Sequence, residues 1–203
     1  MKKLLLIALA TVSGSSVFAN LYSGAGGNLV DNAAGVTFNI NVPDTIGTVS
    51  FIRLNGLTHT WVGDLIVTVT NASGNSIQLM QRVGSTTSTG LGDSSNLNGD
   101  YRFINGGANL WTAAAGGDST FNIPGGDYEA SSRDGLFAYL PVSINGLDNS
   151  VAGNWTINFS DNAGGDTGAL TSWDIEAAPV PEPATMAALG MGALALLRRR
   201  KKA

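Results

Sequence analysis

Alternation of apolar and polar residues is the dominant pattern along this chain, and it is typical of β-strands that bury one face. In residues 36–42 every second residue is apolar, and Pro43 ends the pattern. Similar short segments recur between turns rich in glycine, asparagine and aspartate. We therefore predict strands at residues 36–42, 47–54, 64–70, 76–83, 101–104, 119–123 and 137–144, with long loops at 84–100 and 105–117.

The clearest alternation lies near the end of the body, in residues 153–176. Trp155 and Phe159 share one face of a first strand, and Trp173 marks the apolar face of a second. The turn between them, residues 161–168, is acidic and glycine-rich, so we predict that the two strands form a hairpin. About eight short strands and no long amphipathic helix predict an all-β fold, a jelly-roll or Greek-key β-sandwich that this hairpin closes.

The composition excludes some classes of function. The chain has no cysteine, so a secreted form must rely on packing or on a bound metal and not on disulfides. Seven of the eleven basic residues lie at the two ends, and between residues 20 and 179 four basic residues face fourteen acidic ones, a net charge of −10. This charge argues against a nucleic-acid partner, which needs a basic face, and it is compatible with binding a cation.

The first nineteen residues have the three parts of a secretory signal peptide. Lys2 and Lys3 make a basic start, residues 4–10 are apolar, and Val17 and Ala19 place compact residues where a signal peptidase cleaves. We predict export and cleavage after Ala19. The chain is then divided into a signal peptide at 1–19, a β-sandwich domain at 20–178 and a C-terminal segment at 179–203.

The C-terminal segment contains Pro181, Glu182 and Pro183, followed by fourteen mostly apolar residues at 184–197. As a helix these fourteen would span about 21 Å, less than the roughly 30 Å of a bilayer core. Five basic residues come next: Arg198, Arg199, Arg200, Lys201 and Lys202. This three-part layout resembles the PEP-CTERM sorting signal of Gram-negative bacteria that make extracellular polysaccharide.

The PEP-CTERM resemblance implies that an exosortase, a membrane-embedded protease, recognises the segment and cleaves it near Pro-Glu-Pro. Before cleavage, the segment would anchor the chain transiently in the inner membrane, with its basic residues in the cytoplasm. After cleavage, the domain would reach the cell envelope, the outer surface or the extracellular matrix. An ordinary single-span anchor is the alternative.

Three stretches of the body resemble the P domain, or P/Homo B domain, that follows the catalytic domain of subtilisin-like proprotein convertases. They are residues 59–65 (HTWVGDL), 153–156 (GNWT) and 161–173 (DNAGGDTGALTSW), whereas residues 127–135 depart from the family's pattern. The resemblance implies a jelly-roll β-sandwich with an accessory role, which stabilises a neighbouring protease domain. The serine endopeptidase activity associated with that family belongs to the catalytic domain, and only sixteen residues separate Ala19 from Val36.

We expect no catalytic residues in the body. Any serine triad would have to use the one histidine, His59, and no Gly-x-Ser-x-Gly sequence marks a nucleophile. We interpret His59 as a structural residue hydrogen-bonded to the backbone. One histidine without cysteine also disfavours zinc. Asp161 and Asp166 share one turn, which does not suit two carboxyl groups on opposite sides of a sugar bond.

The acidic turn is the best candidate for a cofactor site. Calcium takes about six to eight oxygen ligands, and Asp161, Asn162 and Asp166 offer side-chain oxygens. If the P-domain resemblance holds, Asp64 lies beside this turn and contributes a further carboxylate. We therefore predict a calcium site at these four residues. The alternative is plain turn chemistry, since turns favour aspartate, asparagine and glycine in any case.

Two further roles stay open beside a structural one. The domain could bind glycans of the extracellular polysaccharide, with Trp61, Tyr101 and Trp111 as aromatic residues that stack on sugars. Trp111 lies in a glycine-rich loop and is the best candidate for an exposed aromatic side chain. Alternatively, the domain could be an accessory subunit of a separately encoded subtilisin-like serine protease.

Overall fold

The computed structural model describes residues 18–32, 35–114, 116–181 and 190–192. Most of the described residues lie in β-strands, which confirms the all-β prediction. The strands are β1 (Asn20–Asn28), β2 (Val36–Val42), β3 (Ile46–His59), β4 (Leu65–Thr70), β5 (Ser76–Gln81), β6 (Asn96–Ala108), β7 (Asn122–Ile123), β8 (Gly126–Tyr128), β9 (Ala130–Arg133), β10 (Tyr139–Val142), β11 (Gly153–Asp161) and β12 (Gly168–Pro179). The short helices are η1 (Val62–Asp64), α1 (Leu110–Ala114) and η2 (Ile144–Leu147).

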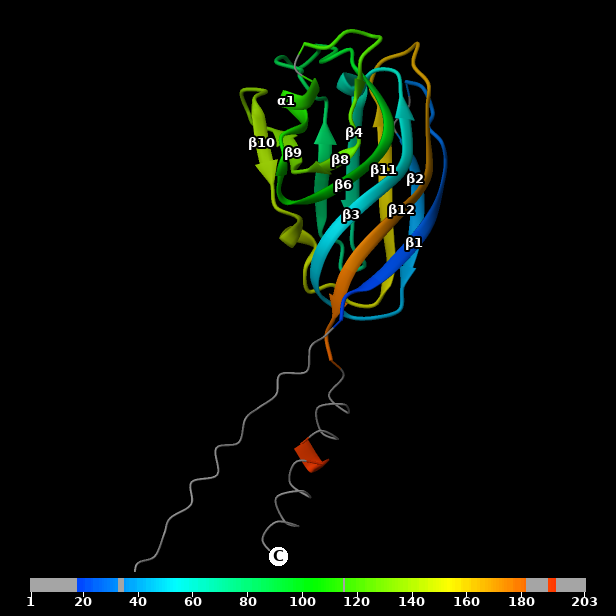
Figure 1. Ribbon diagram of the computed structural model, residues 1–203, viewed down its shortest axis with the longest axis vertical. Helices are drawn as coiled ribbons and strands as arrows, with labels where there is room; N and C mark the ends of the chain where they lie inside the picture. The colour runs from blue at the N-terminus through cyan, green and yellow to red at the C-terminus, as the bar shows by residue number, and fades with distance from the viewer. Residues whose placement is uncertain (1–17, 33–34, 115, 182–189, 193–203) are drawn as a thin grey trace, which may run out of the picture.

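Two sheets pack face to face (Figure 1). The larger has the strand order β1-β12-β3-β6-β7, with β8 also paired to β6, and the smaller has the order β2-β11-β4-β5. The strands β9 and β10 form a separate two-stranded ribbon. All pairings are antiparallel except those of β6 with β7 and with β8.

The core between the sheets is built by the alternation seen in the sequence. Trp155 on β11 and Trp173 on β12 are both fully buried, one from each sheet. Val67 and Val69 on β4 are buried as well, as their period-two spacing predicts. Large aromatic side chains remove about 150–250 Å² each from water, so the two tryptophans are principal contributors to the stability of the core.

The predicted hairpin at 153–176 is wrong. The strands β11 and β12 do not pair with each other, because β11 pairs with β2 and β4 in the smaller sheet whereas β12 pairs with β1 and β3 in the larger. Hairpin loops usually have about two to five residues, and facing sheets lie about 10 Å apart. The longer turn between Asp161 and Gly168 therefore crosses from one sheet to the other at one end of the sandwich.

The first strand, β1, was not predicted, because its segment looks like a glycine-rich lead. It pairs with β12 over nearly its whole length, from Asn20 opposite Ala177 to Asn28 opposite Ala169. Its glycines allow close approach on both sides: a Cβ atom on Gly26 would lie 2.1 Å from the main-chain oxygen of Leu170 on β12, and one on Gly24 would lie 2.5 Å from Ile40 Cγ1 on β2. Similarly, β6 begins inside the predicted loop 84–100, and α1 occupies part of the predicted loop 105–117.

Both ends of the domain lie at the same end of the sandwich. Asn20 pairs with Ala177, and β12 ends at Pro179, whereas the other end of β12 brings Gly168 beside His59 (Figure 1). At about 3.3 Å per residue, β12 separates Pro179 from Gly168 by roughly 35 Å. Anything at the His59 end of the sandwich therefore lies far from the start of the C-terminal segment.

Several predicted features lie outside the described residues. They are residues 1–17 of the signal peptide, Glu182 and Pro183 of the Pro-Glu-Pro motif, most of the apolar stretch 184–197, and Arg198, Arg199, Arg200, Lys201 and Lys202. Pro181 is described and follows β12 closely. Among the described helices, none has the length and apolar character needed to cross a membrane.

Candidate functional site

Two segments that are far apart in the sequence meet at the end of the sandwich opposite Pro179. Asp64 ends the helix η1, and the residue after it, Leu65, pairs with Asp161 at the end of β11. Asn162 fixes this junction with two hydrogen bonds to the main-chain oxygen of Asp64, from its backbone nitrogen (3.0 Å) and from Nδ2 (2.9 Å). The structure therefore brings together three of the four predicted calcium ligands, Asp64, Asp161 and Asn162.

The carboxylate of Asp64 is buried and only partly satisfied. The residue is 2% exposed, and its Oδ1 atom has no hydrogen-bond partner. Arg82 Nη2 lies 3.7 Å from this oxygen, which is beyond hydrogen-bonding distance. The guanidinium instead donates to the main-chain oxygens of Gly63 (3.4 Å) and Gly90 (2.6 Å). A buried, unpaired carboxylate oxygen is costly, so it demands a physical explanation.

The pKa of Asp64 is shifted mainly by burial, and among its neighbours Asp166 has the largest effect. Burial raises the pKa of Asp64, and a side-chain hydrogen bond and charge repulsion from Asp166 raise it further, to about 7. The charge of Arg82 opposes this shift, whereas the charge of Asp161 adds to it. Carboxylates that share a site cannot all ionise freely. The site therefore holds more negative charge than the nearby arginine neutralises.

His59 holds Asp161 in place. Its Nε2 atom lies 3.2 Å from Asp161 Oδ2, and the backbone nitrogen of Trp61 lies 3.1 Å from Nδ1. Nδ1 also lies 3.0 Å from the main-chain oxygen of Trp61, so the tautomer decides whether this atom accepts from the N–H or donates to the oxygen. The His59 side chain is fully buried and reaches the Asp161 carboxylate and the Trp61 backbone. This agrees with its interpretation as a structural residue.

The rest of the acidic turn is ordered by hydrogen bonds from its neighbours. Thr60 Oγ1 donates to Asp166 Oδ1 at 2.8 Å and accepts the backbone N–H of Thr167 at 3.1 Å. The backbone N–H of Gly165 donates to the carboxylate of Asp31, at 3.1 Å and 3.0 Å from its two oxygens. The sequence argument missed Thr60 and Asp31. The alternation of Thr58, His59 and Thr60 at the end of β3 is the signal that could have identified Thr60.

As a metal centre, this cluster is incomplete in the arrangement described. Across residues 18–32, 35–114, 116–181 and 190–192, no three His, Cys, Asp or Glu side chains converge on a common point suited to a metal ion. Asn162 also turns its amide N–H toward Asp64, whereas a calcium ligand would present its oxygen. The orphaned Oδ1 of Asp64 and its crowding by Asp166 nevertheless fit a cation, which would satisfy the oxygen and relieve the repulsion.

Of the three aromatic residues considered for sugar stacking, Tyr101 is ruled out by its burial, whereas Trp61 and Trp111 are half-buried. Tyr101 is fully buried and donates its hydroxyl to the main-chain oxygen of Ile123 at 2.7 Å. Trp61 is half-buried, and its Nε1 donates to the main-chain oxygen of Leu91. Trp111 is also half-buried and packs edge-on against Tyr139, with ring centroids 6.0 Å apart. Neighbouring groups therefore hold both tryptophans in place, and sugar stacking on Trp61 and Trp111 stays a prediction.

Comparisons with solved structures give only weak similarities. The crystal structure of the Aeromonas sobria serine protease with the chaperone ORF2 matches at 14% identity and a TM-score of 0.40, over 80% of this chain and 28% of that one. A second structure of the serine protease of Aeromonas sobria matches at 14% identity and a TM-score of 0.41, over 79% and 27%. A structure of infectious bursal disease virus, Gt strain, matches at 13% identity and a TM-score of 0.27, over 78% and 32%. The chain thus spans at most about a third of the chains it matches.

No curated protein matches the chain. A family profile does match its C-terminal part: residues 179–201 fit the PEP-CTERM protein-sorting motif. The match covers the Pro-Glu-Pro sequence, the apolar stretch and most of the basic cluster. The chain therefore carries a PEP-CTERM sorting motif, which indicates exosortase-dependent export and surface sorting in a Gram-negative bacterium.

Proposed function

We propose that this protein is an exported, surface-sorted β-sandwich of the P-domain type, with a structural or binding role in the cell envelope or extracellular matrix and no catalytic activity of its own. The observation that carries the proposal is the position of the sorting motif. It begins at Pro179, the residue at which β12 ends. The motif thus follows the folded domain without a linker, as suits a signal that delivers one domain to the surface.

The P-domain assignment is supported by contacts among the three stretches that resemble this family, residues 59–65, 153–156 and 161–173. His59 of the first stretch contacts Asp161 of the third, and Leu65 of the first pairs with Asp161 in the smaller sheet. Trp155 of the second stretch and Trp173 of the third are both fully buried in the core. A jelly-roll connectivity is compatible with two facing sheets whose sequential strands cross between them.

A non-catalytic role is supported by the position of the one histidine. A serine hydrolase needs its histidine within reach of both a nucleophile and the substrate. The His59 side chain is fully buried, and its partners are Asp161 and the backbone of Trp61. An accessory role beside a separately encoded subtilisin-like protease is the alternative that the P-domain resemblance supports.

Calcium is the cofactor that the acidic cluster supports best. Asp64, Asp161 and Asp166 would supply carboxylate oxygens, and Asn162 would join them after a rotation of its amide group. A bound calcium ion would supply positive charge and oxygen coordination at the junction between the two sheets. The residues themselves hold the β11–β12 turn against η1, so that the ion would act as a clamp and not as a reagent.

Processing of the full-length chain tests the proposed export route. We expect an epitope-tagged chain to lose its C-terminal segment and to appear in the outer fractions of an exosortase-containing host. Replacing Pro181, Glu182 and Pro183 together by alanine should leave the chain unprocessed in the inner membrane. The neighbouring Val180→Ala substitution serves as the control and should be processed normally. Normal processing of the triple variant would refute this route.

A further inference from the structure

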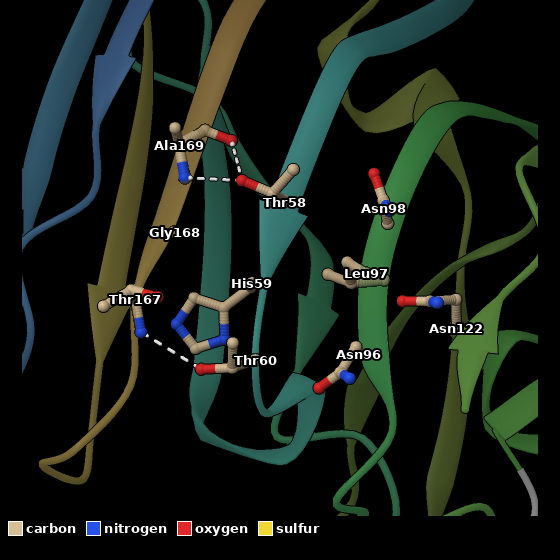
Figure 2. A pocket seen from close by; sticks show the side chains of 10 residues that line it. All are labelled: Thr58, His59, Thr60, Asn96, Leu97, Asn98, Asn122, Thr167, Gly168 and Ala169. Carbon is tan, nitrogen blue, oxygen red and sulfur yellow. Dashed lines mark hydrogen bonds between the residues drawn. The ribbon is translucent and has the colours of Figure 1, made fainter. Parts of the chain in front are cut away.

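A polar pocket of about 400 Å³ lies on the larger sheet beside the acidic turn, whose last residues, Thr167 and Gly168, form part of its lining. Figure 2 shows that its lining comes from the ends of β3, β6, β7 and β12. The polar side chains around it are amides and hydroxyls: Thr58, Thr60, Asn96, Asn98, Asn122 and Thr167. This pocket was not foreseen, because Asn96 and Asn98 lie in a segment that was predicted to be a loop.

Strand pairing places these polar groups in a regular array. Thr58 on β3 lies opposite Asn98 on β6, and Asn96 on β6 lies opposite Asn122 on β7. The residues between them, His59 and Leu97, form a pair of their own and are buried. Side chains on one face of a sheet repeat at about 4.8 Å across strands and about 6.7 Å along them. The amides and hydroxyls therefore recur at regular intervals both along and across the strands, on the sheet face opposite to the buried side chains of His59 and Leu97.

Several hydrogen-bonding groups in this pocket have no partner within the described part of the chain. The exposed side chains of Asn98 and Asn122 make no hydrogen bond there. Asn96 Nδ2 donates to the main-chain oxygen of Ser119 at 2.7 Å, whereas its Oδ1 is buried and unpartnered. A buried amide oxygen normally has a partner. The pocket therefore presents both donors and acceptors that a ligand could satisfy.

The lining disfavours an anionic ligand. Apart from His59, whose ring is fully buried against Asp161, none of the ten lining residues has an ionisable side chain. The body as a whole carries a net charge of −10, which repels acidic ligands. Its four arginines are elsewhere, and two of them, Arg53 and Arg102, are paired with Asp174 and Asp127. A phosphate or a uronate would find no cation in this pocket.

The chemistry of the lining favours sugar hydroxyls over peptide side chains. A hydroxyl both donates and accepts, and so matches a mixed set of amides and threonine hydroxyls. A peptide anchored by apolar side chains needs a hydrophobic pocket, and the apolar side chains in this lining are those of Leu97, which is buried, and Ala169, which is small. We infer that this pocket is a binding subsite for a neutral carbohydrate, contacted through Asn96, Asn98 and Asn122.

The position of the pocket suits a surface-sorted protein. It lies beside His59 and Gly168, at the end of the sandwich opposite Pro179, where the sorting motif begins. A chain held at a membrane by its C-terminal segment would therefore present this pocket outward, roughly 35 Å from the attachment point. The inference is independent of the calcium proposal, because the three asparagines belong to β6 and β7 and not to the acidic turn.

Affinity electrophoresis of the purified full-length protein tests this inference. Native gels would contain a neutral polysaccharide (dextran, starch or galactomannan) or the acidic polymer alginate, each with calcium and with chelator. We expect retardation by at least one neutral polymer, competed by its free sugar, and none by alginate. The double variant Asn98→Ala/Asn122→Ala should bind about tenfold more weakly, since two neutral hydrogen bonds are lost.

Asn41→Ala on β2 is the matched control, because Asn41 is an equally exposed asparagine on the smaller sheet. It should bind like the wild type, and both variants should keep the wild-type melting temperature. Three results would overturn the inference: no retardation by any neutral polymer, retardation by alginate alone, or equal binding by wild type and the double variant. A melting temperature that depends on calcium, together with no sugar binding, would support the cation site and refute the sugar subsite.

Discussion

His59 Nε2 lies 3.2 Å from Asp161 Oδ2, although the two residues are 102 positions apart in the chain. Both side chains are almost completely buried, at 0% and 3% exposure. This contact ties the end of β3 in the larger sheet to the end of β11 in the smaller sheet. It therefore closes the end of the sandwich at which the acidic turn, η1 and the polar pocket meet.

Removing the imidazole should destabilise the protein. His59→Ala leaves Asp161 Oδ2 buried without the imidazole, while Oδ1 keeps the backbone N–H of Ala163, and the loss costs about 2–4 kcal/mol. For a domain of this size the melting temperature should fall by roughly 5–15 °C. His59→Gln keeps a donor near Asp161 and should recover part of this loss. Equal stability of His59→Ala and wild type in thermal unfolding would show that the contact contributes nothing.

Calcium should stabilise the protein if the acidic cluster binds it. Calcium at about one hundred times its dissociation constant would contribute about 2.7 kcal/mol, or roughly 5–10 °C in melting temperature. The measurement is thermal unfolding of the full-length protein in calcium and in chelator. Magnesium is the control, since it demands a tighter octahedral geometry and should give a smaller shift. Identical melting temperatures in calcium and chelator would remove the calcium proposal.

Replacing Asp64 should separate two effects on stability: binding of a cation and repulsion between neighbouring carboxylates. Asp64→Asn removes one of the two adjacent acids, so in chelator at pH 8 the variant should be at least as stable as the wild type. In calcium it should lose most of the stabilisation, because a ligand is missing. Glu176→Gln removes the same charge from β12, away from the cluster, and should keep the full calcium response. A normal calcium response in Asp64→Asn would exclude Asp64 as a ligand.

The sequence predicted those parts of the fold that depend on local alternation. The bounds of β2 were predicted without error, and the buried residues of β4 follow from their spacing. Pairing is a different matter, because a strand's partner depends on distant residues. Strands β11 and β12 look like a hairpin in sequence, yet each pairs within its own sheet. The glycines of β1 hid a strand because their role is to permit close approach to Ile40 and Leu170.

The proximity of Asp64 to the acidic turn was foreseen, but Thr60, Asp31 and the contacts of the site were not. Asp64 was placed beside the acidic turn through the P-domain resemblance, and the structure brings it there. Alternation and spacing cannot show that Asn162 turns its N–H groups toward Asp64, or that His59 reaches Asp161. The pocket at Asn96 and Asn98 was missed because two alternating asparagines are too short a pattern to distinguish a strand from a loop.

An ion pair between the buried carboxylate of Asp174 and the partly exposed Arg53 gives a pH-dependent prediction. Asp174 is 4% exposed and accepts hydrogen bonds at Oδ2 from Arg53 Nη2 (2.6 Å) and Asn55 Nδ2 (2.9 Å). Burial alone would raise the pKa of Asp174, but hydrogen bonds from Asn55, Ser23 and Arg53, with the charge of Arg53, outweigh burial and lower it. The folded protein therefore binds the proton of Asp174 more weakly than the unfolded chain does.

The sign of the pH effect follows from this lowered pKa. Stabilisation by Asp174 is fully present above the unfolded pKa, near 3.9, and is lost as the pH falls through the lower folded pKa. Asp174→Asn should thus cost about 1–3 kcal/mol at pH 7 in chemical denaturation, and the difference from wild type should shrink below about pH 4. Asp127→Asn is the control, because its pair with Arg102 is over 40% exposed on both sides and should leave stability nearly unchanged. If the free energies of unfolding of wild type and Asp174→Asn differ by the same amount from pH 7 to pH 2, the carboxylate acts through its shape and not through its charge.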